Sequence, residues 1–474
     1  MRDAVVTVLF LAVWLLLFLG YYRLRVTPSE RNVVHATSRW TLAILAVVVI
    51  AKYAASLAGA GYVVRRVIIY AIPAPLLNAP WYSAAIAGAL LGLVVWYRRK
   101  DSGNIVITLT SLWLIFVLFA LGVAGLRSGA AGIAYPFTRG EWEYVADARL
   151  ISSIPEFLRS YVVLYPELSM HGKAHPPGNA ILIHVLQRLL HVDTLGLALL
   201  IVAIGGTFVF PTYFFWKSFL PPTGLLAAMP IFILTPSLVM FSATCMDIVT
   251  VPFFWLALLL SVRAWRTTAL LSFGAGLACG LASMLSFQFL PFGAVFIYFL
   301  LRLTRGPEGL AWETLLARAG ATIGGFVAFH ILLSQFTGYS MIENFRAAQE
   351  VHFTIVDAGA QSLGAYLLFA VMNVTAALIY LGIINNVLFA RLLKKHGWSR
   401  LGLDLAGTGY LMIALLVLTG LYQAEVERIW LFVTPLFVPA IIKNLQVTRL
   451  PHGIAVALLT LQILVMETLF YTFW

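Results

Sequence analysis

Residues 105–125, IVITLTSLWLIFVLFALGVAG, form an apolar stretch without Asp, Glu, Lys or Arg. A helix that crosses a bilayer needs about 20 such residues, so this stretch predicts a membrane span. Further candidate spans lie at 5–22, 40–58, 82–97, 194–216, 221–238, 245–262, 268–285, 287–303, 315–337, 364–390, 402–421, 429–443 and 453–473. The sequence therefore predicts an all-α polytopic membrane protein with about fourteen transmembrane helices.

The composition excludes most other classes of protein. Of 474 residues, 61% are hydrophobic and 11% are charged, whereas soluble domains have about 45–50% apolar and about 25% charged residues. The net charge of +12 does not indicate nucleic-acid binding, because membrane proteins collect Lys and Arg in their cytoplasmic loops. The two cysteines, Cys245 and Cys279, are too few for a disulfide framework or a metal cluster, and we expect both to pack between helices.

The distribution of charge predicts the orientation of the chain. One set of loops carries most of the basic residues, including Arg98, Arg99, Lys394 and Lys395, and is therefore predicted to be cytoplasmic. Most of the 19 Asp and Glu residues lie in or beside the opposite loops, at 126–193, 338–363 and 422–428. This asymmetry predicts a multi-pass plasma-membrane protein with a carboxylate-rich site on its extracytoplasmic face.

The loop at 126–193 is the richest polar segment between predicted spans. Within it, residues 176–191 (PPGNAILIHVLQRLLH) are too short to cross a bilayer and contain Gln187, Arg188 and His191. Counting them as a span would also place Lys394 and Lys395 outside. We therefore expect a juxtamembrane helix that lies on the membrane surface.

Two acids in this loop are candidates for acid–base chemistry. Glu143 and Asp147 are four residues apart, so they would share one face of a helix. Like charges at this spacing are mildly destabilising, which favours a functional pair. The alternative is a solvated amphipathic helix.

Two histidines follow in the same loop. His171 and His175 have a spacing that suits metal ligands on a helix, but Gly172 lies between them and Pro176-Pro177 follows. The proline favours an extended conformation at His175, so a zinc pair is only weakly indicated. Two imidazoles that face a polar site beside a rigid turn fit the sequence better.

Further candidates lie at the ends of later spans. Asp247 begins an apolar run, where a carboxylate is costly unless it is paired or lines water; the alternative is an acid that stabilises a helix N-terminus. Arg346 lies in the loop at 338–363, and Glu427 and Arg428 directly precede a span. Arg428 suits bidentate binding of phosphate, or else a salt bridge with Glu425 or Glu427.

In combination, these features resemble the glycosyltransferase-C superfamily, most closely the branch of protein O-mannosyltransferases and the aminoarabinose transferase of lipid A. The resemblance covers residues 105–300. The matching elements are the span at 105–125, the loop acid Asp147, His175-Pro176-Pro177-Gly178 before an interfacial helix, Thr235-Pro236, Asp247 and the Gly-rich FGAGLACGLASMLSF. Three features depart from the family. The first-loop acid of the family usually lies closer to its span than Asp147 lies to residue 125, which leaves Glu141 or Glu143 as the alternative equivalent. Ser286-Phe287-Gln288 stands where a lysine is common, and three spans precede the shared core.

The resemblance implies an inverting glycosyltransferase that moves a sugar from a polyprenyl-phosphate carrier to an extracytoplasmic lipid, glycan or protein. Asp147 is then the preferred general base, with Glu143 as the alternative, and Arg428 binds the carrier phosphate, with Arg346 or Lys173 as substitutes. Asp247, His171 and His175 would orient the base, the acceptor or a divalent metal, and Glu427 is a further substrate-binding candidate. We expect additional helices at 1–104, a catalytic core at 105–303 and helices that complete the donor site at 304–474.

The main alternative is a transporter or flippase of lipid-linked sugars. Transporters place ionisable groups near the midplane, within related halves, whereas here the polar residues gather at one face and no inverted repeat is evident. A ligase or polymerase of lipid-linked polysaccharide would share the chemistry and differ in substrate. The expected partners are a lipid-linked donor, an acceptor and membrane lipids, but not nucleic acid. No metal ligands are assigned, and a divalent cation is compatible with these residues without being required by them.

Overall fold

The chain is an all-α polytopic membrane protein. The computed structural model describes residues 2–58, 68–100, 103–305, 309–355, 362–397, 404–420, 422 and 425–472. Within these residues, ten helices are long and apolar enough to cross a membrane. The chain divides into two compact units: unit 1 comprises Met1–Ile133, Trp216–Ile248 and Gly359–Trp474, and unit 2 comprises Ala134–Phe215 and Val249–Ala358.

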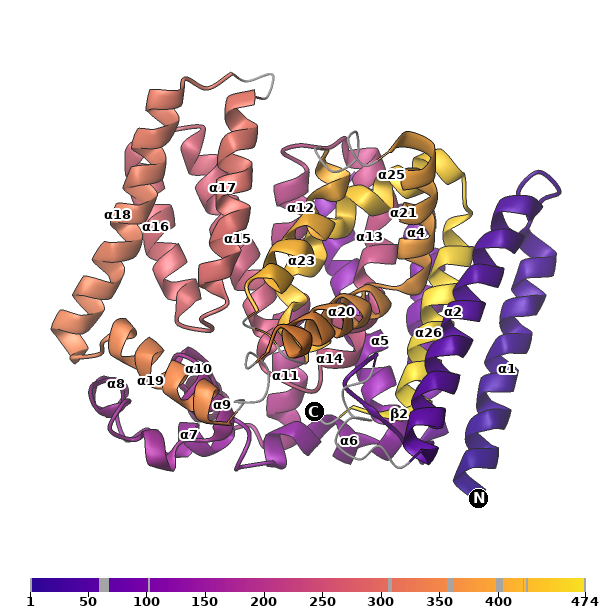
Figure 1. Cartoon of the computed structure of the whole chain (residues 1–474), viewed down its shortest axis with the longest axis horizontal. Helices are drawn as coiled ribbons and strands as arrows, with labels where there is room; N and C mark the ends of the chain where they lie inside the picture. Colours follow the sequence, from indigo (N-terminus) through magenta and orange to yellow (C-terminus); the bar gives the residue numbers. More distant parts are fainter. Residues whose placement is uncertain are drawn as a thin grey trace. The chain divides into compact units, whose positions relative to one another are not determined.

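Unit 1 is built from helices and one short strand pair. Its elements are α1 (Arg2–Arg25), α2 (Arg31–Leu57), β1 (Ile72–Pro73), η1 (Pro80–Tyr82), α4 (Ser83–Arg99), α5 (Ile105–Ser128), α6 (Ala130–Ala134), α13 (Pro222–Ile233), α14 (Pro236–Phe241), α20 (Leu363–Tyr380), α21 (Ile383–His396), η4 (Leu405–Gly407), α23 (Thr408–Leu418), α24 (Val426–Ile429), η5 (Leu431–Phe437), α25 (Val438–Thr448), α26 (His452–Leu469) and β2 (Phe470–Tyr471). Figure 1 shows α1 and α2 running antiparallel, and both pack against α26.

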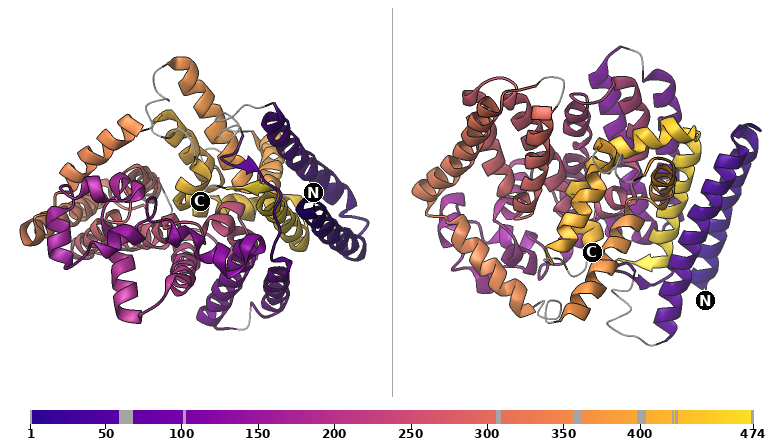
Figure 2. Two further views of the ribbon diagram at one scale, coloured as in Figure 1. Left: turned by 90° about the horizontal axis from the view of Figure 1, so that it is seen from below. Right: turned by 45° about the horizontal axis from the view of Figure 1, so that its top comes forward.

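Unit 2 combines long helices with a set of short ones. Its elements are η2 (Tyr135–Thr138), α7 (Val145–Arg149), α8 (Ile154–Ser160), η3 (Tyr165–Glu167), α9 (Met170–Ala174), α10 (Gly178–Leu190), α11 (Thr194–Gly206), α12 (Val209–Trp216), most of α15 (Asp247–Trp265), α16 (Ala269–Ser283), α17 (Phe289–Arg305), α18 (Trp312–Thr337) and α19 (Met341–Ile355). The short helices α7 to α9 all belong to the predicted outer loop (Figures 1 and 2).

Local sequence explains where α5 begins and ends. The side chain of Asn104 accepts hydrogen bonds from the backbone nitrogens of Val106 and Ile107, at 2.9 and 3.2 Å, as an N-cap residue does. Gly129 ends the helix with a φ of 62°, a conformation that favours glycine. The predicted span at 105–125 is therefore a helix with a defined cap at each end.

Close packing of α16 on α18 explains the Gly-rich stretch at 273–287. A Cβ at Gly276 would collide with the carbonyl of Thr322, and one at Gly325 would collide with the carbonyl of Phe273. Small residues let the backbones of membrane helices approach closely. Gly276 and Gly325 thus serve the packing of these two helices within unit 2.

Arg127 joins the end of α5 to the strand pair. β1 and β2 pair antiparallel, with Ile72 opposite Tyr471 and Pro73 opposite Phe470. The guanidinium of Arg127 donates to the carbonyl of Phe470 at 2.7 Å and to that of Ala74 at 2.5 Å. The last predicted span, 453–473, thus ends as a helix at Leu469 and continues as the strand Phe470–Tyr471.

Several predicted spans differ from the helices observed. The stretch 364–390 was expected to be one span but comprises α20 and α21, which are separated at Gly382 (φ 98°). The stretches 221–238, 268–285 and 402–421 contain apolar helices of only 12, 15 and 14 residues, Pro222–Ile233, Ala269–Ser283 and Leu405–Leu418. The domain boundaries expected at 104 and 303 stay predictions.

Candidate functional site

Asp147, on α7, connects two short helices of unit 2. It is completely buried, and it accepts hydrogen bonds from the backbone nitrogen of Ser169 at 2.6 Å and from the Ser169 Oγ at 2.7 Å. Burial raises the pKa of the Asp147 carboxyl, although both hydrogen bonds oppose the shift. A Cβ at Gly172 would collide with this carboxylate. Asp147 therefore holds α9 tightly against α7.

Glu143 is the second buried acid of this loop, with 4% of its surface exposed. Its Oε1 lies 3.4 Å from the Nδ1 of His171, while its Oε2 is buried and has no hydrogen-bond partner in the part of the chain that the structure describes. Because Glu143 and Asp147 are both buried, the alternative of a solvated helix does not hold for them. Glu143 and His171 form a buried carboxylate–imidazole pair.

Two tyrosines contact the segment that carries His171 and His175. The ring of Tyr144 packs against those of His171 and His175, with centroids 5.7 and 6.2 Å away. The hydroxyl of Tyr161 donates to the carbonyls of Gly172 at 2.7 Å and His175 at 3.1 Å. Burial raises the pKa of Tyr161 well above its usual range, so its hydroxyl keeps the proton that it donates. The backbone of 172–175 is thereby held in place.

Asn344, on α19, supports the same loop. Its side-chain nitrogen donates to the hydroxyl of Tyr165 at 2.7 Å, and its Oδ1 accepts from the hydroxyl of Tyr339 at 2.8 Å. The Tyr161 ring packs edge-on against both of these tyrosines. This buried network of hydrogen bonds and packed rings fixes the loop to α19 within unit 2.

The His-Pro-Pro-Gly element contacts the turn after α16. His175 has an extended backbone (φ −135°, ψ 165°), which confirms the expectation from the proline that follows it. Its Nδ1 lies 3.3 Å from the Oγ of Ser286. The backbone nitrogen of Gly178 donates to the carbonyl of Met284 at 2.9 Å, where a Cβ would collide. Ser286 and Met284 therefore join this turn to the His175-Pro176-Pro177-Gly178 element.

After this turn, residues 178–190 form α10, which confirms the expected helix. Its 13 residues are too few to cross a bilayer, and its position on the membrane surface stays a prediction. Lys173, on α9, is partly exposed, and Arg346, on α19, is exposed. These two cations belong to unit 2 together with Glu143 and His171.

Unit 1 holds the other candidate residues. The guanidinium of Arg428 contacts the carboxylates of Asp247 and Glu425, each at 2.9 Å. Asp247 begins α15, so both the expected ion pairing and the alternative of a helix N-terminal acid apply to it. The salt bridge with Glu425 was the alternative to phosphate binding by Arg428.

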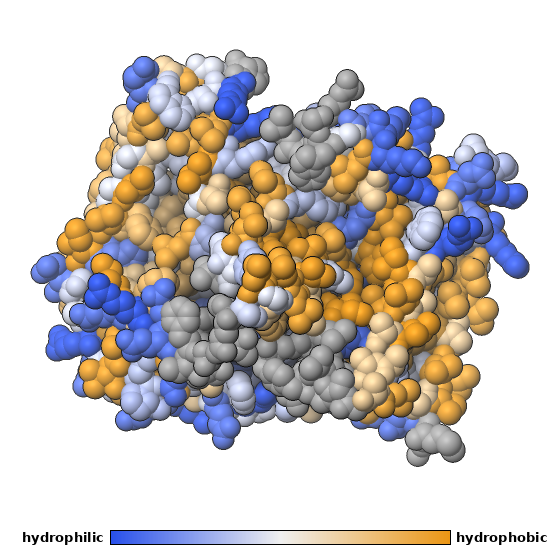
Figure 3. All heavy atoms as spheres, in the orientation of Figure 1, coloured by the Kyte–Doolittle hydropathy of each residue, from blue (hydrophilic) through white to orange (hydrophobic). Residues whose placement is uncertain are grey.

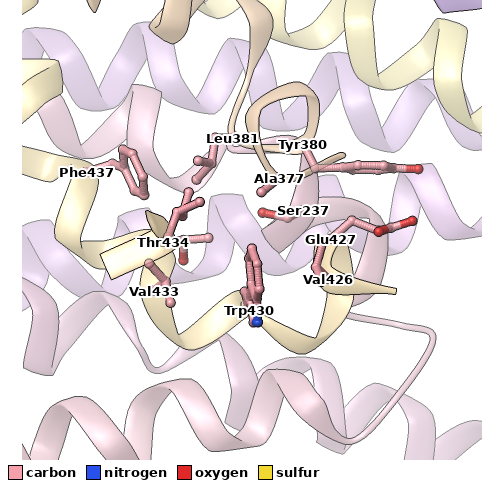
Figure 4. Close-up of a pocket in the computed structure, with 11 residues that line it drawn as sticks. Ser237, Ala377, Tyr380, Leu381, Val426, Glu427, Trp430, Val433, Thr434 and Phe437 are labelled. Carbon is pink, nitrogen blue, oxygen red and sulfur yellow. The ribbon is translucent and has the colours of Figure 1, made fainter. Parts of the chain in front are cut away.

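Glu427 lies beside a small cavity in unit 1 (Figure 4). It is 2% exposed, and its Oε1 accepts a hydrogen bond from the backbone nitrogen of Tyr70 at 2.8 Å. Burial raises the pKa of Glu427 to about 7. The cavity has a volume of about 20 Å³ and is also lined by Tyr380 and Trp430, which leaves room for about one water molecule. These surroundings favour a structural role for Glu427.

Within the described residues, neither unit offers an evident metal site. Among the described residues, no group of three or more His, Cys, Asp or Glu side chains is placed to hold a metal ion. Cys245 and Cys279 are both buried thiols that are not joined in a disulfide, in line with the expected packing role. Parts of the other predicted outer loops, residues 356–361 and 423–424, lie outside the described residues.

Sequence reasoning missed several residues that build the unit 2 site, namely Tyr144, Tyr161, Ser169 and Ser286. The concentration of tyrosines at 135–165 was the available signal for the buried hydrogen-bond network. No protein-family model matches the chain, and a comparison with curated proteins finds no match either.

Proposed function

We propose that this protein is a membrane glycosyltransferase that moves a sugar from a polyprenyl-phosphate carrier to an extracytoplasmic acceptor. The proposal includes a GT-C-like fold with about fourteen spans and a site in the outer loop at 126–193 of a plasma-membrane protein. It is supported by the order of the elements at 105–300 and by the contact of His175 with the turn at Ser286. In the resembling family, these two motifs also follow one another along the chain.

The observation that carries the proposal is the buried Glu143–His171 pair. A carboxylate that is held beside an imidazole and keeps one oxygen without a partner can accept a proton from a hydroxyl group. Asp147 is less suited to this step, because Ser169 occupies both of its oxygens and none of its surface is exposed. We therefore assign the general base to Glu143 and make Asp147 a positioning residue.

The proposed reaction needs no redox step. As the acceptor oxygen forms a bond to the anomeric carbon, Glu143 takes the hydroxyl proton and the bond from that carbon to the phosphate oxygen breaks. Attack opposite the leaving group inverts the anomeric centre, and the electron pair of the broken bond stays on the lipid phosphate. A cation must stabilise this phosphate. Lys173, two residues from His171, is the preferred group within unit 2, with Arg346 as the alternative.

The test is transfer of a labelled sugar from polyprenyl phosphate to acceptors, measured with the purified chain in lipid. Glu143→Gln should lower turnover by about 10²–10⁴-fold, the usual contribution of a general base, while donor binding survives. Glu167→Gln is the matched control, because Glu167 is an exposed acid of the same loop. Full turnover in Glu143→Gln would refute the assignment of the base.

The competing class, a transporter or flippase, predicts a different product. A transporter would move the intact lipid-linked sugar across the bilayer, whereas a transferase releases the free lipid phosphate. Measuring free polyprenyl phosphate in the same assay therefore separates the two. Movement of intact donor without its release would overturn the proposed function.

A further inference from the structure

Unit 1 contains a cavity of about 730 Å³ that the candidate site does not use. Ligand sites in proteins commonly measure about 300–1,000 Å³. The cavity lies among the later part of α1, the later part of α4 and the first part of α26, with Pro230 of α13 at its wall. These segments meet only in the folded unit, so hydropathy along the chain does not reveal the cavity.

The cavity is cationic and polar at one end. Arg25 is the last residue of α1, Arg98 is the penultimate residue of α4 and His452 is the first residue of α26. The hydroxyl of Tyr97 lies 3.3 Å from the Nδ1 of His452, and the Nζ of Lys100 lies 4.0 Å from the centre of the Tyr97 ring. None of the residues described as lining the cavity is Asp or Glu. This end therefore suits an anion.

The remainder of the cavity is apolar. Leucines, valine, alanine, phenylalanine and tryptophan line it as it follows α26 from His452 to Leu461, a distance of about 14 Å along a helix. Figure 3 shows the same division on the visible face of unit 1, with hydrophilic side chains at the upper ends of α1 and α2 and hydrophobic ones below. The cavity thus has the polarity of a lipid, with a charged head and an apolar tail.

We propose that this cavity binds an anionic phospholipid from the leaflet on its basic side. The two guanidinium groups would hold the phosphate, since Arg matches the geometry of phosphate oxygens, and an acyl chain would lie along α26. The Lys and Arg distribution predicts that this side is cytoplasmic, where anionic lipids attract basic groups between membrane helices. This inference does not depend on the proposed glycosyltransferase activity.

The test compares two lipids with identical acyl chains, phosphatidylglycerol and phosphatidylcholine. The delipidated full chain should gain more thermal stability from phosphatidylglycerol, and lipid should remain bound to it in native mass spectrometry. The double variant Arg25→Gln/Arg98→Gln should bind phosphatidylglycerol at least about tenfold more weakly, which corresponds to roughly 1.4 kcal/mol. Ala457→Trp, which fills the apolar part, should reduce the binding of either lipid.

Arg23→Gln/Arg99→Gln is the matched control. These arginines are exposed neighbours on the same two helices but do not line the cavity, so the control should keep wild-type binding. Equal binding by the two double variants would overturn the proposal, and so would equal stabilisation by both lipids. Displacement of phosphatidylglycerol by polyprenyl phosphate at far lower concentration would assign the cavity to the carrier lipid instead and would also overturn it.

Discussion

Ser169 donates two hydrogen bonds to Asp147, one from its backbone nitrogen at 2.6 Å and one from its Oγ at 2.7 Å. The same Oγ accepts from the nitrogen of Gly172 at 3.0 Å, so one serine caps α9 and binds α7. The sequence favoured Asp147 as the general base, a role that no observation tests and that we propose for Glu143 instead. The geometry gives Asp147 the task of fixing the short helix on which His171 lies.

Removing the Asp147–Ser169 contact should cost stability. In Asp147→Asn, the amide nitrogen cannot accept a hydrogen bond from Ser169, so one buried donor loses its partner and the free energy of unfolding should fall by about 1–3 kcal/mol. Ser169→Ala should have a similar effect, because it also removes the cap of α9. Since both changes break the same contact, the double variant should lose less than the sum in a thermal double-mutant cycle.

A catalytic role for Asp147 predicts a different outcome. In that case Asp147→Asn would melt like the wild type and would lose turnover as completely as Glu143→Gln. Measuring melting temperature and transfer activity on the same preparations distinguishes a positioning residue from the base.

The predicted orientation can be tested by labelling. In a background without Cys245 and Cys279, Ser128→Cys and Ser340→Cys should react with an impermeant thiol reagent on intact cells, because the acidic loops are predicted to be outside. Lys395→Cys, at the exposed end of α21, should react only after the membrane is opened. The reverse pattern would invert the orientation and place the Glu143–His171 pair in the cytoplasm.

The apolar stretches were predictable because burial in a membrane requires a long run of hydrophobic residues. The same signal could not show the break at Gly382, since hydropathy stays high on both sides of it and the break depends on one backbone conformation. β1 and β2 were missed for a related reason. Their pairing joins residues near 72 to residues near 471, and two-residue strands leave no periodic pattern.

The candidate site was predictable in its residue types but not in its contacts. The acids and histidines stand out in so apolar a chain, and Pro176 correctly indicated the extended backbone of His175. Which acid keeps a free oxygen depends on Ser169, 22 residues from Asp147, and the partner of His175 lies 111 residues away at Ser286. Contacts at such separations are decided by tertiary packing.

Glu427 should make stability depend on pH. Its pKa is raised by burial to about 7 in the folded chain from an ordinary value of 4.5, so the folded state binds the proton more tightly than the unfolded state. The stabilisation is fully present below about pH 4.5 and is lost as the pH rises through about 7, a change of roughly 3 kcal/mol. Glu427→Gln should remove this dependence, whereas Glu343→Gln, at an exposed acid, should keep it. The check is the melting temperature of wild type and Glu427→Gln between pH 5 and pH 8, a range set about the raised pKa. If the melting temperatures of both proteins change with pH in parallel, the raised pKa of Glu427 is contradicted.

Arg428 provides the last prediction, because the ion pairs that it forms and the phosphate binding expected of it from the sequence predict different effects of its substitution. Its guanidinium contacts the carboxylates of Asp247 and Glu425 at 2.9 Å, and Asp247 is only 6% exposed. Arg428→Ala would leave Asp247 buried without this cation, which should cost about 3–5 kcal/mol of stability. Arg428→Lys should recover only part of the loss, since an ammonium is a point donor and cannot reproduce two contacts from a rigid plane.

Affinity for polyprenyl phosphate, measured on the same variants, separates the two roles of Arg428. If the ion pairs are its function, the surviving folded protein should bind the carrier with unchanged affinity, and Asp247→Asn should be destabilised as well, because it weakens the same contact. Arg305→Ala, at an exposed arginine, should change neither property. The opposite outcome is that Arg428→Ala weakens carrier binding by about 2–4 kcal/mol, the cost of breaking a charged hydrogen-bonded pair, and keeps the wild-type melting temperature. In that case the guanidinium binds phosphate, and the ion pairs with Asp247 and Glu425 are not its function.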